Sequence, residues 1–235
     1  RGKAKEIRKY FDEFSEKYME EVHTHSAGTK YLSYIELEFL QSCSTALGTK
    51  VLEIGIGRGR LAISLCQNDV TVDGIDISRK MVEQTRQDLK GERINLLVAD
   101  ACALPYRENY FDSVLSIRVL KYIVSWKEMI KEVSRVLKPN GFFVFDISNR
   151  YSIACLGLRK NYRLFTYQDI CQVLRKYGFK IVRIKATNRF PFLLYRRTNG
   201  RTLKVLVELE KSMERFLPAG FLARSVLIVA RALGD

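Results

Sequence analysis

Short apolar segments that suit β-strands alternate with amphipathic segments that suit α-helices along most of this 235-residue chain. The candidate strands, each bounded by turn residues, are 50–55, 70–76, 94–100, 111–117, 141–147, 179–186 and 225–232. Regular alternation of this kind predicts a mostly parallel sheet with helices on both of its faces. We therefore expect an α/β fold with seven strands and one hydrophobic core.

Two of the intervening segments carry clear helix boundaries. In residues 78–91, Ser78 suits the start of a helix and Gly91 suits its end. In residues 125–141, apolar side chains recur at helical spacing until Pro139 stops the pattern. We expect a helix in each segment.

The cysteine pattern and the hydropathy of the chain indicate its cellular compartment. Five cysteines make an odd number, and none forms a C-x-x-C pair, which disfavours a disulfide framework and a zinc site. No apolar run approaches the roughly 20 residues that span a bilayer, and residues 1–18 lack the apolar centre of a signal peptide. We therefore expect a cytoplasmic protein without a metal.

Positive charge is concentrated in the last third of the chain. Residues 151–235 contain 17 Lys and Arg against 5 Asp and Glu, so they carry 12 of the 14 net positive charges. A local basic surface says more about partners than about fold. It suits peripheral contact with an anionic membrane or with RNA.

Three glycines follow the first candidate strand at alternate positions, Gly55, Gly57 and Gly59. In a sheet of this class ligands bind beyond the carboxyl ends of the strands, and glycine in the first turn lets the backbone approach a ligand closely. A nicotinamide or flavin dinucleotide is one candidate ligand, but its fingerprint needs a third small residue where Arg60 stands. A phosphate-binding loop is excluded because no G-K-[ST] sequence follows.

The segment E-I-G-I-G-R-G resembles the E-x-G-x-G-x-G motif of class I S-adenosylmethionine-dependent methyltransferases. The resemblance continues in order with V-D-G-I-D-I-S, V-A-D-A-C-A-L-P-Y and E-V-S-R-V-L-K-P-N-G-F-F-V-F-D, and it covers about residues 48–148. It implies a Rossmann-like sheet whose last strand is antiparallel. It also implies S-adenosylmethionine as methyl donor and S-adenosylhomocysteine as product, with no metal.

The motifs and the resemblance together indicate a cofactor site. Its expected residues are Tyr18, Glu53, Gly55, Gly57, Gly59, Asp76, Ile77, Asp100, Ala101 and Ile117. Asp76 ends a strand 21 positions after Gly55, where a carboxylate can accept two hydrogen bonds from a ribose diol; a helix cap is its alternative role. In similar enzymes, the acid at Asp100 accepts a hydrogen bond from the adenine amino group and Ala101 offers its backbone amide; a solvated loop carboxylate is the alternative role of Asp100.

Four positions have competing interpretations. Glu53 stands in an apolar strand, where an unpaired charge is costly; in the family this acid holds the methionine end of the cofactor, and an ion pair with Arg60 is the alternative. Ile117 marks the turn where the family brings backbone carbonyls near the cofactor's amino group. Tyr18 resembles a family tyrosine near the cofactor carboxylate, or packs on a helix face. Arg118 suits a ligand carboxylate and a solvated surface equally.

The acceptor is less visible in the sequence. Because a sulfonium already makes its methyl group electrophilic, catalysis rests on aligning the acceptor, with a base only where a proton must leave. The segment S-I-R-V-L-K-Y-I lacks the D/N-P-P-Y motif of amino-methylating nucleic-acid enzymes, and no cysteine stands there in a P-C context. The only histidines, His23 and His25, are candidate catalytic residues in an N-terminal lid, with plain lid or surface roles as the alternative.

Residues 186–224 lie between the last two candidate strands, where this family usually builds substrate-recognising insertions. Their apolar helix face predicts either a cover packed on the domain or an acceptor channel. The arginines that would rim such a channel are Arg189, Arg196, Arg197 and Arg201. We expect a single domain composed of an N-terminal helical cap (1–48), a core (49–185), this insertion (186–224) and the final strand (225–235).

We therefore expect a methyltransferase that acts on a small or lipid-like molecule. An RNA methyltransferase is one alternative, supported by the charge but by no recognisable RNA-binding module. A cofactor-binding but inert partner subunit is another, because no catalytic signature excludes it. The sequence does not indicate an oligomeric state.

Overall fold

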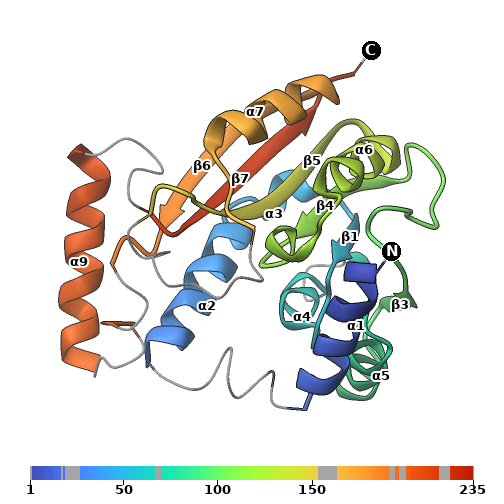
Figure 1. The fold of residues 1–235 in the computed structure, drawn as a ribbon, viewed down its shortest axis with the longest axis horizontal. Helices are drawn as coiled ribbons and strands as arrows, with labels where there is room; N and C mark the ends of the chain where they lie inside the picture. The colour runs from blue at the N-terminus through green and yellow to red at the C-terminus, as the bar shows by residue number, and fades with distance from the viewer. Residues whose placement is uncertain are drawn as a thin grey trace.

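The computed structural model describes residues 2–16, 18, 27–66, 70–152, 163–190, 194–195, 200–216 and 223–234. Its strands are β1 (Lys50–Ile54), β2 (Thr71–Asp76), β3 (Ile94–Val98), β4 (Phe111–Ser116), β5 (Leu137–Ser148), β6 (Phe179–Thr187) and β7 (Ser225–Ala232). Its helices are α1 (Gly2–Phe14), α2 (Ala27–Gln41), α3 (Ser44–Leu47), α4 (Arg60–Cys66), α5 (Arg79–Asp88), α6 (Trp126–Val136), α7 (Tyr167–Lys176) and α9 (Gly200–Phe216), with a short 3-10 helix η2 (Leu120–Tyr122). Figure 1 shows these elements along the chain.

The pairing of the strands confirms the predicted topology. The strands form one sheet in the order β3-β2-β1-β4-β5-β7-β6. β1 pairs in parallel with β2 and β4, β2 with β3, and β4 with β5. β7 runs antiparallel to both β5 and β6, so the last strand is the antiparallel one.

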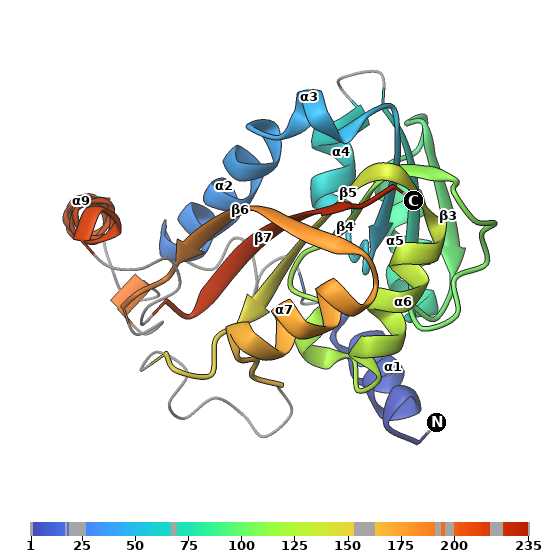
Figure 2. The same cartoon turned by 90° about the horizontal axis from the view of Figure 1, so that it is seen from above.

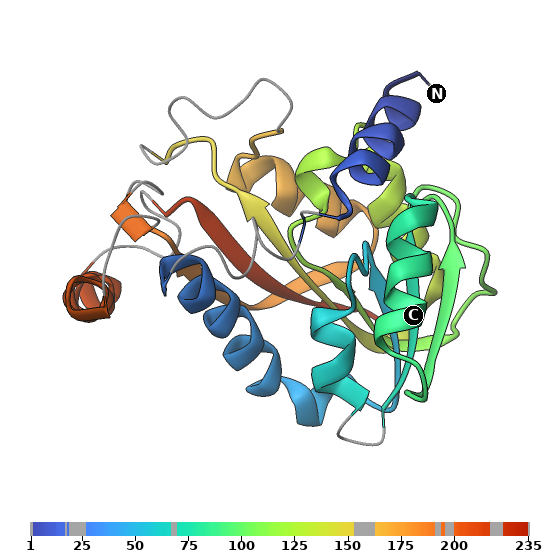
Figure 3. The same cartoon turned by 90° about the horizontal axis from the view of Figure 1, so that it is seen from below.

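Helices cover both faces of this sheet (Figures 2 and 3). Successive residues of a strand point to opposite faces, so Phe143 and Phe145 of β5 join the core under α6 and α7 while Val144 joins the core under α2, α3 and α4. These three side chains are 0% exposed, and burying each one contributes about 1.5–3 kcal/mol. The alternating apolar pattern therefore supplies two cores, one for each face of the sheet, and not the single core expected from the length of the chain.

The helix after β2 begins where the sequence predicts and ends earlier. Ser78 caps α5, since its hydroxyl accepts a hydrogen bond from the Met81 amide at 3.2 Å. The helix stops at Asp88, and Gly91, with a φ of +99°, lies in the turn beyond it. Gly91 therefore shapes the following turn and does not end the helix.

The helix before β5 also ends earlier than predicted. α6 stops at Val136, although the sequence suggested that Pro139 would end it. Proline drives its preceding residue toward extended backbone, and the chain is already extended at Leu137, where β5 begins. The fifth strand is therefore longer at its start than the predicted residues 141–147.

Two helices lie outside the packed layers. α1 has no fully buried residue, and α9 stands at the edge of the molecule in Figures 1 to 3. Among the α9 side chains that the structure describes, only Glu210 is buried; it accepts hydrogen bonds from the Arg189 amide at 2.6 Å and from the Tyr195 hydroxyl. In the described ranges, no helix combines the length and apolarity needed to cross a bilayer.

Candidate functional site

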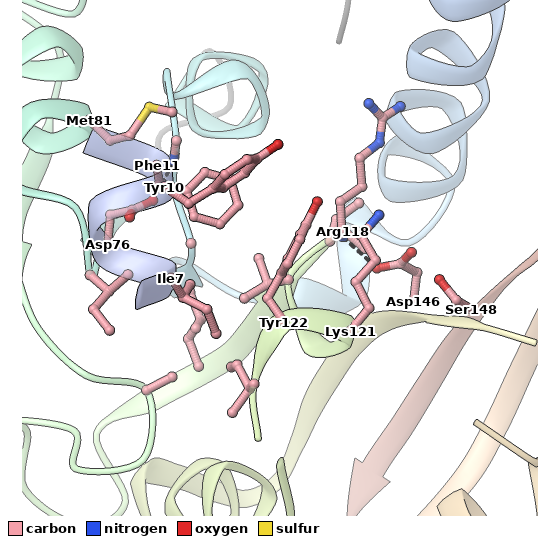
Figure 4. Close-up of a pocket in the computed structure, with 18 of the residues that line it drawn as sticks. Ile7, Tyr10, Phe11, Asp76, Met81, Arg118, Lys121, Tyr122, Asp146 and Ser148 are labelled. Atoms are coloured by element: carbon pink, nitrogen blue, oxygen red, sulfur yellow. Dashed lines mark hydrogen bonds between the residues drawn. The ribbon is translucent and has the colours of Figure 1, made fainter. Parts of the chain in front are cut away.

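A cavity of about 670 Å³ lies at the carboxyl ends of β1, β2 and β4, beside α1 (Figure 4). From the turns after β1 and β2, the predicted residues that line it are Gly55, Gly57, Asp76 and Ile77. From other segments, the predicted residues that line it are Tyr18, Asp100, Ala101 and Ile117. The fold therefore brings eight of the ten expected cofactor residues to one place.

Gly55 and Gly57 shape the turn after β1. Their φ angles are +74° and +53°, a backbone conformation that residues with a Cβ adopt only under strain. A Cβ on Gly55 would stand 2.3 Å from the Cγ2 of Val119, and a Cβ on Gly57 would stand 3.5 Å from the Cε1 of Tyr18. The turn thus presents bare backbone to the cavity, beside the Tyr18 ring.

The other two predicted residues, Gly59 and Glu53, lie behind the cavity. Gly59 allows close packing on the end of α5, because a Cβ there would stand 2.3 Å from the Cδ1 of Leu89. Glu53 is 3% exposed, and burial raises the pKa of its carboxyl to about 8, with Arg60 opposing the shift. Arg60 itself pairs with Glu36 at 2.6 Å, and the Glu53 Oε2 has no hydrogen-bond partner among the described residues.

Asp76 ends β2 and ties two turns together. Its Oδ2 accepts a hydrogen bond from the Gly57 amide at 3.0 Å, and its Oδ1 accepts one from the Ser78 amide at 2.9 Å. Burial raises the pKa of this carboxyl, and the same amide donors oppose the shift. Each carboxylate oxygen can accept a further hydrogen bond, for example from a hydroxyl group. The cap of α5 is Ser78, so Asp76 is left to hold the glycine turn and to face the cavity.

Asp100 follows β3 and orders the next turn. Its Oδ1 accepts a hydrogen bond from the Cys102 amide at 2.9 Å, and its backbone oxygen accepts one from the Ala103 amide at 3.0 Å. Burial first, and the Asp100 charge second, raise the pKa of the Cys102 thiol to about 12. This thiol therefore stays protonated at neutral pH and is a poor nucleophile.

α1 forms the aromatic side of the cavity. The Phe11 ring meets the Tyr122 ring of η2 edge to face, with centroids 5.0 Å apart. Figure 4 shows the Tyr10 and Tyr122 side chains reaching into the same space. Asp12 accepts a hydrogen bond from the Ser78 hydroxyl at 2.5 Å, which holds α1 on the start of α5. The sequence predicts an N-terminal cover, but it does not reveal these contacts.

The far side of the cavity carries charged side chains, of which the sequence had suggested a ligand contact for Arg118 alone (Figure 4). Arg118 donates from Nε to Glu36 at 2.7 Å, and its backbone amide donates to Asp146. Burial lowers the pKa of Lys121 to about 8; Arg118 and Arg224 lower it further, while Asp146 opposes the shift. Burial also raises the pKa of Asp146. One feature of the sequence could have indicated this wall: Asp146 is an acid inside the otherwise apolar run 141–147.

Several predicted residues have other placements. His23 and His25, the candidate catalytic residues, fall outside the described residues, as do Arg196 and Arg197. Arg189 is 6% exposed, so it does not rim a surface channel, whereas Arg201 is exposed on α9. The described residues contain no group of His, Cys, Asp and Glu placed to hold a metal ion.

Comparison with known proteins agrees with this geometry. Residues 52–145 match a family model described as a methyltransferase domain. MJ1252, an uncharacterized protein of Methanocaldococcus jannaschii, is 26% identical over 212 residues, which cover 77% of this chain and 79% of that protein.

Two further curated relatives have named activities. The 27-O-demethylrifamycin SV methyltransferase of Amycolatopsis mediterranei is 37% identical over 100 residues, or 40% of this chain and 36% of the relative. The tRNA (carboxymethyluridine(34)-5-O)-methyltransferase of Arabidopsis thaliana is 32% identical over 143 residues, or 57% of this chain and 33% of the relative. The chain therefore spans about a third of the length of each of these two relatives.

Solved structures share the fold over nearly the whole chain. The magnesium protoporphyrin IX methyltransferase of Synechocystis PCC 6803, solved with S-adenosylhomocysteine bound, has a TM-score of 0.68 at 17% identity and covers 97% of this chain and 99% of its own. A chain in the complex between the Haloferax volcanii Trm112 methyltransferase activator and a methyltransferase has a TM-score of 0.67 at 18% identity, with coverages of 95% and 98%. At sequence identities this low, the similarity to these structures shows a shared fold alone.

Proposed function

Because this chain carries a class I S-adenosylmethionine-dependent methyltransferase domain, we propose that it transfers the methyl group to a small-molecule or lipid-like acceptor. One observation carries the proposal: a single cavity of about 670 Å³ joins a wall of the cofactor-binding type to a second wall of aromatic and charged side chains. Cavities of roughly 300–1,000 Å³ are typical of small-molecule sites.

The first wall of the cavity fits S-adenosylmethionine. The bare turn at Gly55 and Gly57 leaves space for the methionine part, and the Asp76 carboxylate has lone pairs for the ribose diol. We assign Asp100 and Ala101 to the adenine ring. Tyr18, Glu53, Ile77 and Ile117 complete the proposed site, and Gly59 supports the turn.

Alignment and exclusion of water are the contributions we assign to the chain. S-Adenosylmethionine supplies an electrophilic methyl group when bound. The helix α1 covers the cavity. The contact of its Phe11 ring with the Tyr122 ring of η2 closes the space beside the glycine turn. An acceptor held in this space would be aligned with the methyl group and shielded from solvent.

The aromatic and apolar lining favours an organic acceptor. Ile7, Phe11, Phe14, Tyr122 and Ile123 all line the cavity. The rifamycin relative, by its name, methylates an oxygen of a small molecule. We propose small organic molecules as the substrate class of this chain, and we do not propose the rifamycin itself as its substrate.

Transfer of a labelled methyl group tests this proposal. The protein is incubated with S-adenosylmethionine labelled in its methyl group and, in separate arms, with small-molecule extract, lipid extract and total RNA. We expect label in an organic-soluble product, and none with Asp76→Ala. Label in RNA alone would contradict the acceptor class, and cofactor binding without transfer to any arm would favour an inert partner subunit.

An RNA acceptor is the second candidate function. The basic last third, with 17 Lys and Arg against 5 Asp and Glu, and the tRNA-modifying relative both favour it. RNA bound through phosphate contacts dissociates steeply as salt rises. Retention on RNA in low salt that is lost by moderate salt would support this candidate, and flotation with anionic vesicles would instead support the proposed membrane contact.

The proposed cellular setting is the cytoplasm. The cysteines that the structure describes, Cys43, Cys66, Cys102 and Cys171, are free thiols. Free thiols are typical of a reducing compartment.

We also propose a protein activator as partner at the edge of the sheet. Among the residues that the structure describes, β3 pairs with β2 alone, and its Leu97 and Val98 are each 43% exposed. An exposed apolar edge strand is a template for a strand from another chain, and the Haloferax structure is a complex with the Trm112 activator. Leu97→Lys should abolish co-purification with a Trm112-type protein, whereas Val182→Lys on the opposite edge should not; equal effects would contradict this site.

A further inference from the structure

The helix α9 is rich in apolar residues, and none of the apolar side chains that the structure describes on it is buried. These side chains are Leu203, Val205, Leu206, Val207, Leu209 and Met213. In α6, by contrast, Trp126, Met129 and Val133 are all buried. Most of the stability of a protein helix comes from packing of its apolar face. The described part of the domain therefore leaves α9 incompletely covered.

Glu210 marks the face of α9 that turns toward the domain. It is 7% exposed, and its Oε1 accepts hydrogen bonds from the Arg189 amide at 2.6 Å and from the Tyr195 hydroxyl. Asn188 directly precedes Arg189 and lines the cavity, and its backbone oxygen accepts a hydrogen bond from the Arg224 amide at 2.9 Å. The anchor of α9 is therefore next to the charged side of the cavity.

Val205 and Leu209 form a different face of the helix, the outer face. They are four positions apart, so they share one side of α9, and neither is three or four positions from Glu210. Val205 is 60% exposed and Leu209 is 48% exposed. Figures 1 to 3 show α9 at the edge of the molecule, with no other described helix or strand on its outer side. The outer face is therefore accessible to a partner.

Positive side chains accompany the outer face. The exposed cations of α9 are Arg201, Lys204 and Lys211. Among the described side chains of this helix the one exposed carboxylate is Glu208, which pairs with Lys211 at 2.9 Å. On the neighbouring α2, Glu38 pairs with Lys185 of β6 at 3.4 Å. An apolar strip flanked by Lys and Arg is typical of helices that lie on an anionic bilayer, where the cations meet the head groups and the strip enters the acyl boundary.

Two other occupants fit the outer face less well. Single-stranded nucleic acids stack their bases on aromatic side chains, whereas Val205 and Leu209 are aliphatic. A second copy of this chain, docked by the same face, would place the cations of α9 against one another. An anionic lipid surface satisfies both the apolar and the charged part of the face.

We infer that α9 docks this protein on an anionic lipid surface, with Val205 and Leu209 inserted below the head groups and the flanking cations beside lipid phosphates. The inference rests on the proposed function and names the source of its lipid-like acceptor, which is the bilayer. Since Glu210 is tied to Arg189 and Asn188 lines the cavity, a docked α9 places the cavity near the surface that supplies the acceptor.

Flotation with vesicles tests this inference. The protein is centrifuged through a density gradient with vesicles of phosphatidylcholine and phosphatidylglycerol in equal parts, or of phosphatidylcholine alone. The test variant combines Val205→Ser with Leu209→Ser, which leaves the net charge unchanged. The matched control is Val182→Ser on β6, because Val182 is an apolar side chain that is 49% exposed. Lys204→Gln removes one flanking charge.

We expect wild type and Val182→Ser to float with the anionic vesicles and to stay in solution with phosphatidylcholine alone. The double variant should lose about tenfold or more in partition coefficient, because two apolar side chains no longer leave water. Lys204→Gln should lose roughly three- to fivefold. Added salt should weaken the flotation of wild type, because it screens the flanking charges.

Three results would overturn the inference: wild type that stays in solution with anionic vesicles, whether or not it is retained on RNA; a double variant that floats as wild type does; or an equal loss in Val182→Ser. If the double variant does not fold, Val205→Trp decides the matter, since its emission should shift to the blue with anionic vesicles and that of Val182→Trp should not.

Calorimetry with S-adenosylhomocysteine separates this inference from the proposed function. The double variant should bind S-adenosylhomocysteine as wild type does, because α9 lies outside the cofactor wall. Failure of wild type to bind it would contradict the proposed function, whereas flotation tests the docking of α9 alone.

Discussion

The two walls of the cavity are built in different ways. The cofactor wall comes from turns that directly follow β1, β2, β3 and β4, so its residues occur at fixed places after successive strands. The charged wall combines Lys121, Asp146 and Arg224, which come from η2, β5 and the residue directly before β7. The first wall is a property of the sheet, whereas the second depends on how distant segments meet.

This difference separates what the fold requires from what a particular acceptor requires. In an open parallel sheet, the carboxyl ends of the strands form a ligand crevice in any member of the class. The facing wall is free to vary, because nothing in the sheet demands a lysine or an arginine there. Substitutions in the cofactor wall should therefore damage binding of the cofactor, and substitutions in the charged wall should spare it.

Gly55→Ala should have the largest effect. The new side chain would be strained at a φ of +74°, and its Cβ would stand 2.3 Å from the Val119 Cγ2. We expect cofactor affinity to fall by roughly two orders of magnitude or more, measured by calorimetric titration of S-adenosylhomocysteine.

The matched control for this change is Gly91→Ala. Gly91 has a φ of +99° but nothing within 4 Å of the position of a Cβ, and it lies away from the cavity. It should lose about 1–2 kcal/mol of stability through strain alone, with cofactor affinity unchanged. Equal loss of affinity in both variants would show that global strain, and not the glycine turn, controls binding.

Glu53→Gln should have the next largest effect, on stability. Folding raises the pKa of the Glu53 carboxyl from 4.5 to about 8, so between these values the folded protein holds a proton that the unfolded chain has released. The free energy of unfolding of wild type should therefore fall as pH rises from 4.5 to 8. In Glu53→Gln the contribution of Glu53 to this dependence disappears, and at pH 8 the variant should be more stable by on the order of 3 kcal/mol.

Denaturant unfolding at a series of pH values checks this prediction. The difference between variant and wild type should be smallest near pH 4.5 and should grow toward pH 8. A difference that is constant across this range would contradict the assignment of a raised pKa to Glu53.

Asp12→Ala should have the smallest effect. Its carboxylate holds α1 to the Ser78 hydroxyl at 2.5 Å, and α1, which has no fully buried residue, is otherwise held by partly exposed packing such as that of Phe11 on Tyr122. We expect cofactor affinity to fall by roughly three- to tenfold, because one charge-assisted hydrogen bond is lost. Glu13→Ala is the control, since Glu13 is exposed and pairs only with Lys9 in the described structure; an equal loss there would remove the role given to Asp12.

The fold and the cofactor wall were predictable because their signals are local. Alternating apolar runs located the seven strands that the structure describes, and the spacing from Gly55 to Asp76 reflects one turn, the helix α4 and the strand β2. The ends of α5 and α6 were predicted less well. Leu89 and Leu137 leave helical geometry before the glycine and proline signals are reached.

The charged wall was not predictable because its signal is not local. Lys121 and Arg224 are separated by most of the second half of the chain, and only the antiparallel pairing of β7 with β5 brings Arg224 beside Asn149. Arg118 was expected to meet a ligand carboxylate or solvent; it lines the cavity and also pairs with Glu36 of α2. The catalytic roles suggested for His23 and His25 stay predictions.

Calorimetric titration of S-adenosylmethionine and S-adenosylhomocysteine, with NADH as a control ligand, tests the central claim most directly. Wild type should bind the first two at one site with micromolar affinity and should not bind NADH. Asp76→Ala should lose that binding, because the carboxylate that holds the Gly57 turn and lines the cavity is gone. Binding of NADH in their place, or unchanged binding by Asp76→Ala, would contradict the account.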